Sequence, residues 1–363
     1  MHKTDKEMTG ECGMLLEKTK RGICMTGCLM LVGFLAGCGS KDENVSEGMK
    51  LVEALDYQGA LAEFDEAEGC SENARLIARG RGIAYMGLTD YEQAVSCFRE
   101  ALQGSNGLIE EVDFDLNFYL AAAYTKNAQY QEARKVYDAI LALRPEEEDA
   151  HFLRGSVSLE LGDYENAKID FDKVVQMDGK NYDRLIDIYQ VLDKAGYKEV
   201  GQAYLQNALD AGESQMKAYD KGRIYYYMGE YQKAYLALEE ARENGNAESY
   251  LYLGKAYEAT GDYNYASSVY SSYLSKDSGN AEVYNQLGLC EMAKQDYHKA
   301  LEAFQAGMQI AGNGIMQTLS FNEIVAYEYL GEYKKAAVLL DSYLKSYPDD
   351  EKAKREQQFL LTR

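Results

Sequence analysis

Apolar residues recur along most of the chain at intervals of three and four residues, the spacing that gives an α-helix one apolar face. One such series includes Tyr284, Leu287 and Gly288, and the next includes Tyr297 and Phe304. In several pairs of such series, a glycine followed by an acidic residue separates the two members. The pattern predicts pairs of helices that are joined by short turns.

The helix pairs recur with a period close to 34 residues. A tyrosine followed three residues later by alanine or another small residue marks each repeat, and successive tyrosines lie 32 to 39 residues apart. A glycine lies nine residues before most of these tyrosines, and an aromatic residue or leucine lies seven residues after most of them. The marking tyrosines are Tyr57, Tyr91, Tyr130, Tyr164, Tyr197, Tyr231, Tyr263, Tyr297 and Tyr333. This period predicts an array of units that bury their apolar faces against one another.

The segment Gly162-Asp163-Tyr164-Glu165-Asn166-Ala167 and its counterparts at 229–234, 261–266 and 331–336 resemble the tetratricopeptide repeat (TPR) pattern, which covers nearly all of residues 42–350. The resemblance implies an all-α, right-handed superhelical solenoid of about nine helix-turn-helix repeats over residues 47–349. Residues 350–363 are expected to form a C-terminal capping helix. In each unit, the glycine of the turn permits a left-handed backbone, and the following aspartate caps the second helix.

Three places interrupt the period. The longest step contains Gly104-Ser105-Asn106-Gly107, which predicts an extended loop between the second and third repeats, and Ala311-Gly312-Asn313-Gly314 precedes the ninth. In the fifth repeat, Val200-Gly201 occupies the alanine position and Ile188 replaces the glycine. Because glycine weakens a helix interior by about 1 kcal/mol relative to alanine, we predict a hinge at Gly201.

The first 46 residues differ from the repeats. A basic cluster at 18–21 precedes a mostly apolar run over 23–36, which is too short to span a bilayer comfortably and suits the apolar part of a signal peptide. The run ends in Leu35-Ala36-Gly37-Cys38, which resembles a bacterial lipobox. The resemblance implies that residues 1–37 are a lipoprotein signal peptide, that Cys38 is lipidated and that 38–46 form a polar tether. It also implies a lipid-anchored protein on the extracytoplasmic face of a bacterial membrane.

Charge and composition exclude several classes of partner. The chain of 363 residues carries 38 basic and 60 acidic side chains, a net charge of −22. Such a charge repels a nucleic-acid backbone and an anionic membrane surface, so we expect contact with the membrane only through the lipid anchor. The predicted signal peptide is long if translation starts at Met1, and a start at Met14 would give a signal peptide of more usual length.

The sequence contains no recognisable catalytic or metal-binding motif. His151 and His298 are the histidines beyond the leader, and neither has a second histidine at metal-ligand spacing. Cys70, Cys97 and Cys290 are too widely spaced for a zinc site, and we expect them to be small core residues. The sequence therefore predicts a protein without cofactor, metal or catalytic residues, and not an enzyme.

Binding is the function that the resemblance implies. In TPR proteins the first helices line a concave groove, and four positions of each unit commonly face the ligand. Transferred to this sequence, these groove positions include Arg79, Phe118, Phe152, Tyr182, Tyr189, Tyr219, Arg223, Tyr226, Lys255, Asn285 and Phe321. The set is aromatic with a few cations, which suits an extended or helical peptide with apolar anchors. Packing between repeats is an equally good explanation for any one of these aromatic residues.

Two functions remain open at the level of the sequence. The first is an adaptor or scaffold that holds a protein partner in the groove, and the second is binding of a cell-wall glycan such as peptidoglycan. Tyr226, Tyr252 and Tyr265, within a tyrosine-dense stretch over 219–284, have no core position in the repeat pattern and suit either ligand. The sequence identifies neither the partner nor the pathway, the envelope type or the oligomeric state.

Overall fold

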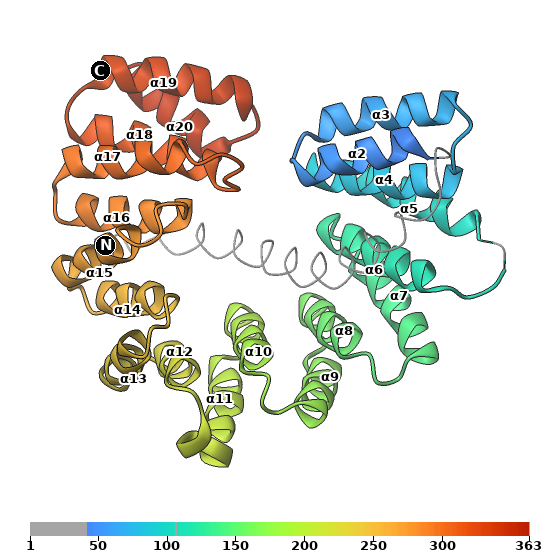
Figure 1. Cartoon of the computed structure of the whole chain (residues 1–363), viewed down its shortest axis with the longest axis horizontal. Coiled ribbons are helices and arrows are strands. Elements are labelled where there is room, and N and C mark those ends of the chain that lie inside the picture. The colour runs from blue at the N-terminus through green and yellow to red at the C-terminus, as the bar shows by residue number, and fades with distance from the viewer. Residues whose placement is uncertain (1–41, 106, 363) are drawn as a thin grey trace. The chain divides into compact units, whose positions relative to one another are not determined.

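The computed structural model describes residues 42–105 and 107–362. These residues form nineteen α-helices and one short 3₁₀ helix, with no strand in the described ranges (Figure 1). Consecutive helices pack as hairpins, and within each of two compact units each hairpin contacts the next along the chain. The structure therefore confirms an all-α fold built from nine helix-turn-helix repeats.

The described residues divide into two compact units, with the boundary between Val174 and Val175, within one helix. Four hairpins belong to the first unit. They are α2 (Glu43–Glu53) with α3 (Tyr57–Gly69), α4 (Ala74–Gly87) with α5 (Tyr91–Gln103), α6 (Glu111–Lys126) with α7 (Tyr130–Leu143), and α8 (Glu148–Glu160) with α9 (Tyr164–Met177).

The second unit contains five hairpins, the 3₁₀ helix η2 (Glu213–Gln215) and a last helix, α20 (Glu351–Leu360). The hairpins are α10 (Tyr182–Lys194) with α11 (Lys198–Gly212), α12 (Ala218–Met228) with α13 (Tyr231–Glu243), α14 (Ser249–Ala259) with α15 (Tyr263–Leu274), α16 (Ala281–Ala293) with α17 (Tyr297–Met308), and α18 (Met316–Tyr329) with α19 (Tyr333–Ser346).

Each hairpin turns at one residue whose backbone is left-handed, with φ between 54° and 86°. In the fourth repeat this residue is Gly162, and the next N–H, that of Asp163, donates to the Ser158 carbonyl oxygen at 2.8 Å. The Asp163 side chain then accepts from the Asn166 N–H at the start of α9. The predicted turn is confirmed, but four turns use a residue other than glycine: Leu55, Thr89, Ala128 and Gln295. The predicted aspartate cap is confirmed in five repeats and was wrong for α7, α11, α13 and α19, where the N-cap residue is not aspartate and its side chain caps no N–H group.

A glycine at one of these four turns is expected to stabilise the protein. Thr89 has φ of 62°, a conformation that is most costly for a β-branched residue. Thr89→Gly should raise the free energy of unfolding by about 1 kcal/mol, measured by urea denaturation. The matched change Gly162→Thr should lower it by a similar amount. A destabilised Thr89→Gly variant would contradict this explanation of the turn.

In five repeats, the core forms where a glycine of the first helix meets an aromatic ring of the second. A Cβ atom at Gly288 would lie 2.3 Å from the ring of Phe304, and one at Gly254 would lie 2.3 Å from the ring of Tyr270. Both rings are completely buried. Phe64 also closes the gap to the following repeat, because its ring would clash with a Cβ atom at Gly80 of α4.

The fifth repeat corrects the register predicted from the tyrosines. In eight repeats the marking tyrosine is the first residue of the second helix, whereas α11 begins at Lys198 and Tyr197 is its N-cap. Counted from the turn residue Gly196, Tyr189 occupies the position of the usual glycine, so the assignment of Ile188 to that position was wrong. A Cβ atom at Gly201 would lie 3.1 Å from the Tyr189 Cα atom. Gly201 therefore makes room for Tyr189 within a continuous helix, and the hinge stays a prediction.

The last helix packs on the final hairpin, as the sequence predicts. Ala353 and Leu360 of α20 are buried in the core that α18 and α19 form. Asp350 caps α20 by accepting from the N–H groups of Lys352 and Ala353, at 2.9 and 3.0 Å. Its other oxygen accepts from the Tyr343 hydroxyl, which fastens the start of α20 to α19.

The described cysteines follow the core prediction in two positions of three. Cys97 and Cys290 are buried, but Cys70 is exposed at the end of α3, so that prediction was wrong for Cys70. Burial raises the pKa of the Cys97 thiol, and the same cause raises that of Cys290. The two buried thiols are thus held in their neutral form as packing groups.

The lipobox prediction concerns residues that the structure does not describe. Cys38 and the rest of residues 1–41 lie outside the described ranges. Within those ranges, no helix combines the length and the apolar character that crossing a bilayer requires.

Candidate binding surface

All eleven groove residues predicted from the sequence lie on first helices of hairpins. None of them is fully exposed. The buried ones are Arg79, Phe152, Tyr189, Arg223, Asn285 and Phe321. The half-buried ones are Phe118, Tyr182, Tyr219, Tyr226 and Lys255. The location on first helices does not by itself test ligand binding, so their role stays a prediction.

Contacts between repeats occupy several of these residues. Arg79 of α4 donates from Nε to the Asp115 carboxylate of α6 at 2.7 Å. Within the fourth hairpin, the Phe152 ring packs on Phe171 of α9, with centroids 6.2 Å apart. Asn285 of α16 accepts from Asn322 Nδ2 of α18 at 2.8 Å. These side chains therefore join neighbouring elements, as packing between repeats would require.

The second unit brings several predicted residues together on α12 and α14. The Arg223 guanidinium lies 4.5 Å from the centre of the Tyr219 ring and 5.8 Å from that of Tyr252. Tyr226 meets Tyr252 edge to face at 5.8 Å, and the Lys255 ammonium lies 5.4 Å from the same ring. We call Tyr219, Tyr226, Tyr252 and Lys255 the tyrosine face. Tyr252 is buried beneath the three half-buried members.

Arg223 is buried next to the tyrosine face and forms ion pairs with two aspartates. Its guanidinium forms ion pairs with Asp220, at 2.8 Å, and with Asp183 of α10. Burial alone would lower the pKa of Arg223, but the hydrogen bond and charge of Asp183 raise it above the ordinary value. Arg223 is therefore a permanently charged support for the tyrosine rings rather than an exposed contact.

Burial affects the phenols at the tyrosine face. It is the main cause that raises the pKa of Tyr219, and it also raises that of Tyr227, which packs against Tyr226 and Tyr252 of the face. The accessible part of the face offers ring edges, phenol hydroxyl groups and the Lys255 side chain. This is the chemistry of a surface that binds apolar and aromatic side chains.

Sequence reasoning missed Asp183, Asp220 and Tyr227 at this site. Asp183 precedes Arg223 by 40 residues, and no local pattern shows that α10 and α12 place them in contact. Tyr265, in contrast, lies outside the tyrosine face. Its ring is 61% exposed and stacks on Tyr257 at 5.3 Å, and Tyr257 stacks on Tyr235 at 4.5 Å.

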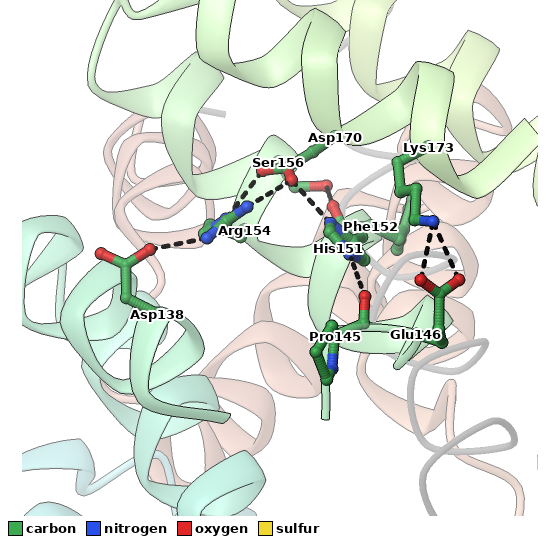
Figure 2. A network of polar contacts seen from close by, with 9 residues as sticks. All are labelled: Asp138, Pro145, Glu146, His151, Phe152, Arg154, Ser156, Asp170 and Lys173. Atoms are coloured by element: carbon green, nitrogen blue, oxygen red, sulfur yellow. Dashed lines mark hydrogen bonds and ion pairs between the residues drawn. The ribbon is translucent and has the colours of Figure 1, made fainter. Parts of the chain in front are cut away.

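A second polar cluster joins α8 to α9 in the first unit. Figure 2 shows the buried Asp170 between the side chains of His151 and Arg154. Arg154 donates to both Asp170 oxygens, at 2.7 and 2.9 Å, and to Asp138 of α7 at 2.8 Å. His151 Nδ1 lies 2.8 Å from Asp170 Oδ1, and its Nε2 lies 3.0 Å from the Pro145 carbonyl oxygen.

His151 and Asp170 are residue types that form catalytic pairs, but their contacts here hold helices together. Both ring nitrogens of His151 face acceptors, so both contacts are hydrogen bonds only when the ring carries two protons. Ser156 donates instead to the Phe152 carbonyl oxygen, within its own helix (Figure 2). Hydrogen bonding to Asp170 is also the first cause that raises the pKa of Arg154. The cluster therefore fastens α7, α8 and α9 to one another.

No group of three or more metal-ligating side chains occurs in the part of the chain that the structure describes. The half-buried carboxylate of Glu258 accepts a hydrogen bond from the Cys290 thiol at 3.0 Å. Burial raises the pKa of Glu258, which favours its neutral form. Glu258 and Cys290 thus form a contact between α14 and α16.

A carboxyl pair links α20 to the hairpin beneath it. Burial, and then the charge of Glu356 on α20, raises the pKa of Glu328 on α18 to about 8. A carboxyl with a raised pKa in the folded chain keeps its proton between the ordinary value near 4.5 and about 8. Folding then binds a proton in this window, so stability falls as the pH rises through it.

Glu328→Gln is expected to remove this pH dependence. Between pH 5 and pH 9 the unmodified protein should lose about 1 to 2 kcal/mol of stability relative to the variant, because solvent partly screens both carboxyls. Urea denaturation at each pH measures the difference. Glu302→Gln, an exposed position on α17, serves as the control and should leave the pH profile unchanged. Parallel profiles for Glu328→Gln and the unmodified protein would contradict the assignment.

Comparisons with known proteins agree with the geometry of the hairpins. Family models described as tetratricopeptide repeat match residues 79–147, 119–182, 219–281, 281–313 and 321–350, together more than half of the chain. The chain is a tetratricopeptide repeat protein. Its turn residues, glycine–aromatic contacts and nine hairpins are the TPR pattern in three dimensions.

Two curated TPR proteins are similar to parts of this chain. The TPR repeat-containing protein YpiA of Bacillus subtilis is 33% identical over 105 residues, which are 29% of this chain and 24% of YpiA. The TPR repeat-containing protein MJ1428 of Methanocaldococcus jannaschii is 25% identical over 206 residues, 53% of this chain and 35% of that protein. The matched region thus spans only about a quarter to a third of these relatives.

Two solved structures share part of their fold with this chain at low sequence identity. Yeast Tom70 is 14% identical, with 88% of each chain covered and a TM-score of 0.48. A tetratricopeptide repeat protein from Parabacteroides merdae is 13% identical, with 70% of this chain and 98% of that chain covered and a TM-score of 0.44.

Proposed function

We propose that this TPR protein is a membrane-anchored, extracytoplasmic scaffold that holds a protein partner on the tyrosine face of α12 and α14. TPR repeats serve as interaction scaffolds, and this one presents half-buried tyrosines and a lysine side by side on first helices. The observation that carries the proposal is the tyrosine face itself. Rigid, amphipathic rings over a fixed arginine give large contact area at low entropic cost.

A pair of binding variants tests the tyrosine face. Tyr226→Ala combined with Lys255→Ala should weaken capture of a specific partner at least tenfold, measured by titration once the partner is isolated from native membranes. Arg223 is a poor target because its removal leaves Asp220 and Asp183 unpaired. Leu236→Ala, at a 76% exposed site on α13, is the matched control. Equal binding by the double variant and the control would refute the assignment.

The lipid anchor is supported by the leader sequence and its Leu35-Ala36-Gly37-Cys38 ending. We expect membrane-extracted protein to begin at Cys38 and to carry a diacylglyceryl group on its sulfur, as detected by mass spectrometry of the N-terminal peptide. Stable anchoring needs about two acyl chains, which this group supplies. Cys38→Ala should lose both the lipid and membrane attachment. Membrane attachment without lipid on Cys38 would contradict the anchor.

One observation favours glycan binding as a second candidate function. The exposed Tyr265 ring at the end of its stack with Tyr257 and Tyr235 is a flat apolar surface of the kind on which a sugar ring can stack. Co-sedimentation with purified peptidoglycan tests this function. Tyr265→Ala should abolish the sedimentation if a glycan binds there, while the tyrosine-face variant should leave it unchanged. No sedimentation of the unmodified protein rules this candidate out.

A further inference from the structure

A cleft in the first unit lies where the long loop interrupts the repeat period. Residues 107–109, which follow α5, and the facing ends of α6 and α7 line an open cleft of about 250 Å³. Leu102, Phe114 and Ile140 form its apolar wall, and Leu108, Ile109 and Leu143 stand around it. These last three side chains are 68, 64 and 57% exposed. Large apolar side chains gathered so openly around one concavity indicate a binding site.

The size of the cleft limits what it can hold. Sites for cofactors and drug-sized ligands usually measure about 300 to 1,000 Å³. A volume of about 250 Å³ suits one or two apolar side chains of a larger partner better. A peptide that inserts such side chains must pass over the rim with its neighbouring residues, so the charge of the rim selects the partner.

Acidic side chains lie at one side of the cleft, and we call them the rim. Asp113 lines the cleft, and Arg75 pairs with it and with Glu110. Arg144 lies 3.5 Å from the centre of the Phe114 ring and pairs with Glu111 and Glu147. Two arginines thus face four carboxylates, and the pKa of Glu147 is raised by burial first and then by the charges of Asp149, Glu111 and Glu148. A positively charged neighbour would relieve this repulsion.

We propose that this acidic-rimmed cleft binds a peptide segment of a partner protein in which apolar side chains are flanked by lysine or arginine. The apolar side chains fill the space between Phe114, Ile109 and Leu143, and the flanking cations pair with Glu111 and its neighbours. The site lies in the first unit and uses none of the residues of the tyrosine face.

Peptide titration tests the cleft directly. The probe is a fluorescein-labelled eight-residue peptide with a central Leu-Ile pair between two Lys-Lys pairs, added to the full-length protein and followed by fluorescence anisotropy. We expect saturable binding that weakens at least threefold between 50 and 300 mM salt. A peptide with serine in place of Leu-Ile, and one with glutamate in place of lysine, should each bind at least tenfold more weakly.

Matched variants localise the binding. Ile109→Ser with Leu143→Ser should weaken binding of the Leu-Ile peptide at least tenfold, whereas Ile169→Ser, 64% exposed on α9 of the same unit, should change it less than twofold. Unchanged urea midpoints confirm that these surface variants fold. Absence of binding to the unmodified protein, equal affinity for the serine peptide, or equal loss in Ile169→Ser would overturn the proposal.

Discussion

Asp170→Ala is expected to lower the free energy of unfolding by about 3 kcal/mol, the largest loss from a single polar side chain in the first unit. Asp170 is 2% exposed and accepts hydrogen bonds from both nitrogens of the Arg154 fork. Its removal leaves Arg154 without its buried counter-charge and His151 Nδ1 without its hydrogen-bond partner. Breaking a buried ion pair costs more than the pair contributes, because the remaining charge stays desolvated.

The measurement is urea denaturation of the unmodified protein, Asp170→Ala and a control. Asp172→Ala is the matched control, because its carboxylate is 49% exposed and pairs with Lys168 on the surface of the same helix. That variant should change stability by less than about 0.5 kcal/mol. Equal effects of the two substitutions would show that the cluster in Figure 2 does not fasten α8 to α9.

Replacing both members of one glycine–aromatic pair, Gly288 and Phe304, gives the second prediction of a large effect on the free energy of unfolding. Gly288→Ile alone should cost about 3 kcal/mol, because a Cβ atom already lies 2.3 Å from the buried Phe304 ring. Phe304→Leu alone should cost about 1 to 2 kcal/mol through lost packing. The double variant copies the ninth repeat, where Ile324 and Leu340 occupy the same positions and are both buried. It should be more stable than the sum of the single changes predicts, by at least about 1.5 kcal/mol.

A double-mutant cycle measured by urea denaturation gives this coupling energy. Gly69→Ile, where a Cβ atom would meet open space at the end of α3, should change stability by less than about 0.5 kcal/mol. Strictly additive losses at positions 288 and 304 would contradict direct contact as the reason for the glycine.

The fold could be predicted because the same local sequence features recur in each repeat. Turn, cap and apolar spacing all lie within one 34-residue unit, so the sequence shows them without knowledge of distant contacts. The register failed only in the fifth repeat. There Tyr197 occupies the N-cap position of α11 instead of its first helical position. The first helix has Tyr189 where most other repeats have glycine, and Gly201 of the second helix makes room for it. This compensation is visible only in the packing of α10 on α11.

The candidate site could be predicted only in part. The repeat pattern placed Tyr219, Tyr226 and Lys255 on first helices, but it could not show that Arg223 is buried. That burial depends on Asp183, which belongs to the previous hairpin. The apolar cleft escaped prediction for a similar reason, since its wall combines a loop with the ends of two helices. Contacts between repeats are non-local, and a single sequence does not reveal them.

Site-specific photo-crosslinking in native membranes tests the scaffold function most directly. A benzophenone amino acid replaces Lys255 on the tyrosine face or, as the control, Leu236 on α13. The proposed function predicts that one protein is cross-linked reproducibly from position 255, that it is absent from position 236, and that Tyr226→Ala reduces its yield. No cross-linked protein from position 255, or the same products from both positions, would contradict it.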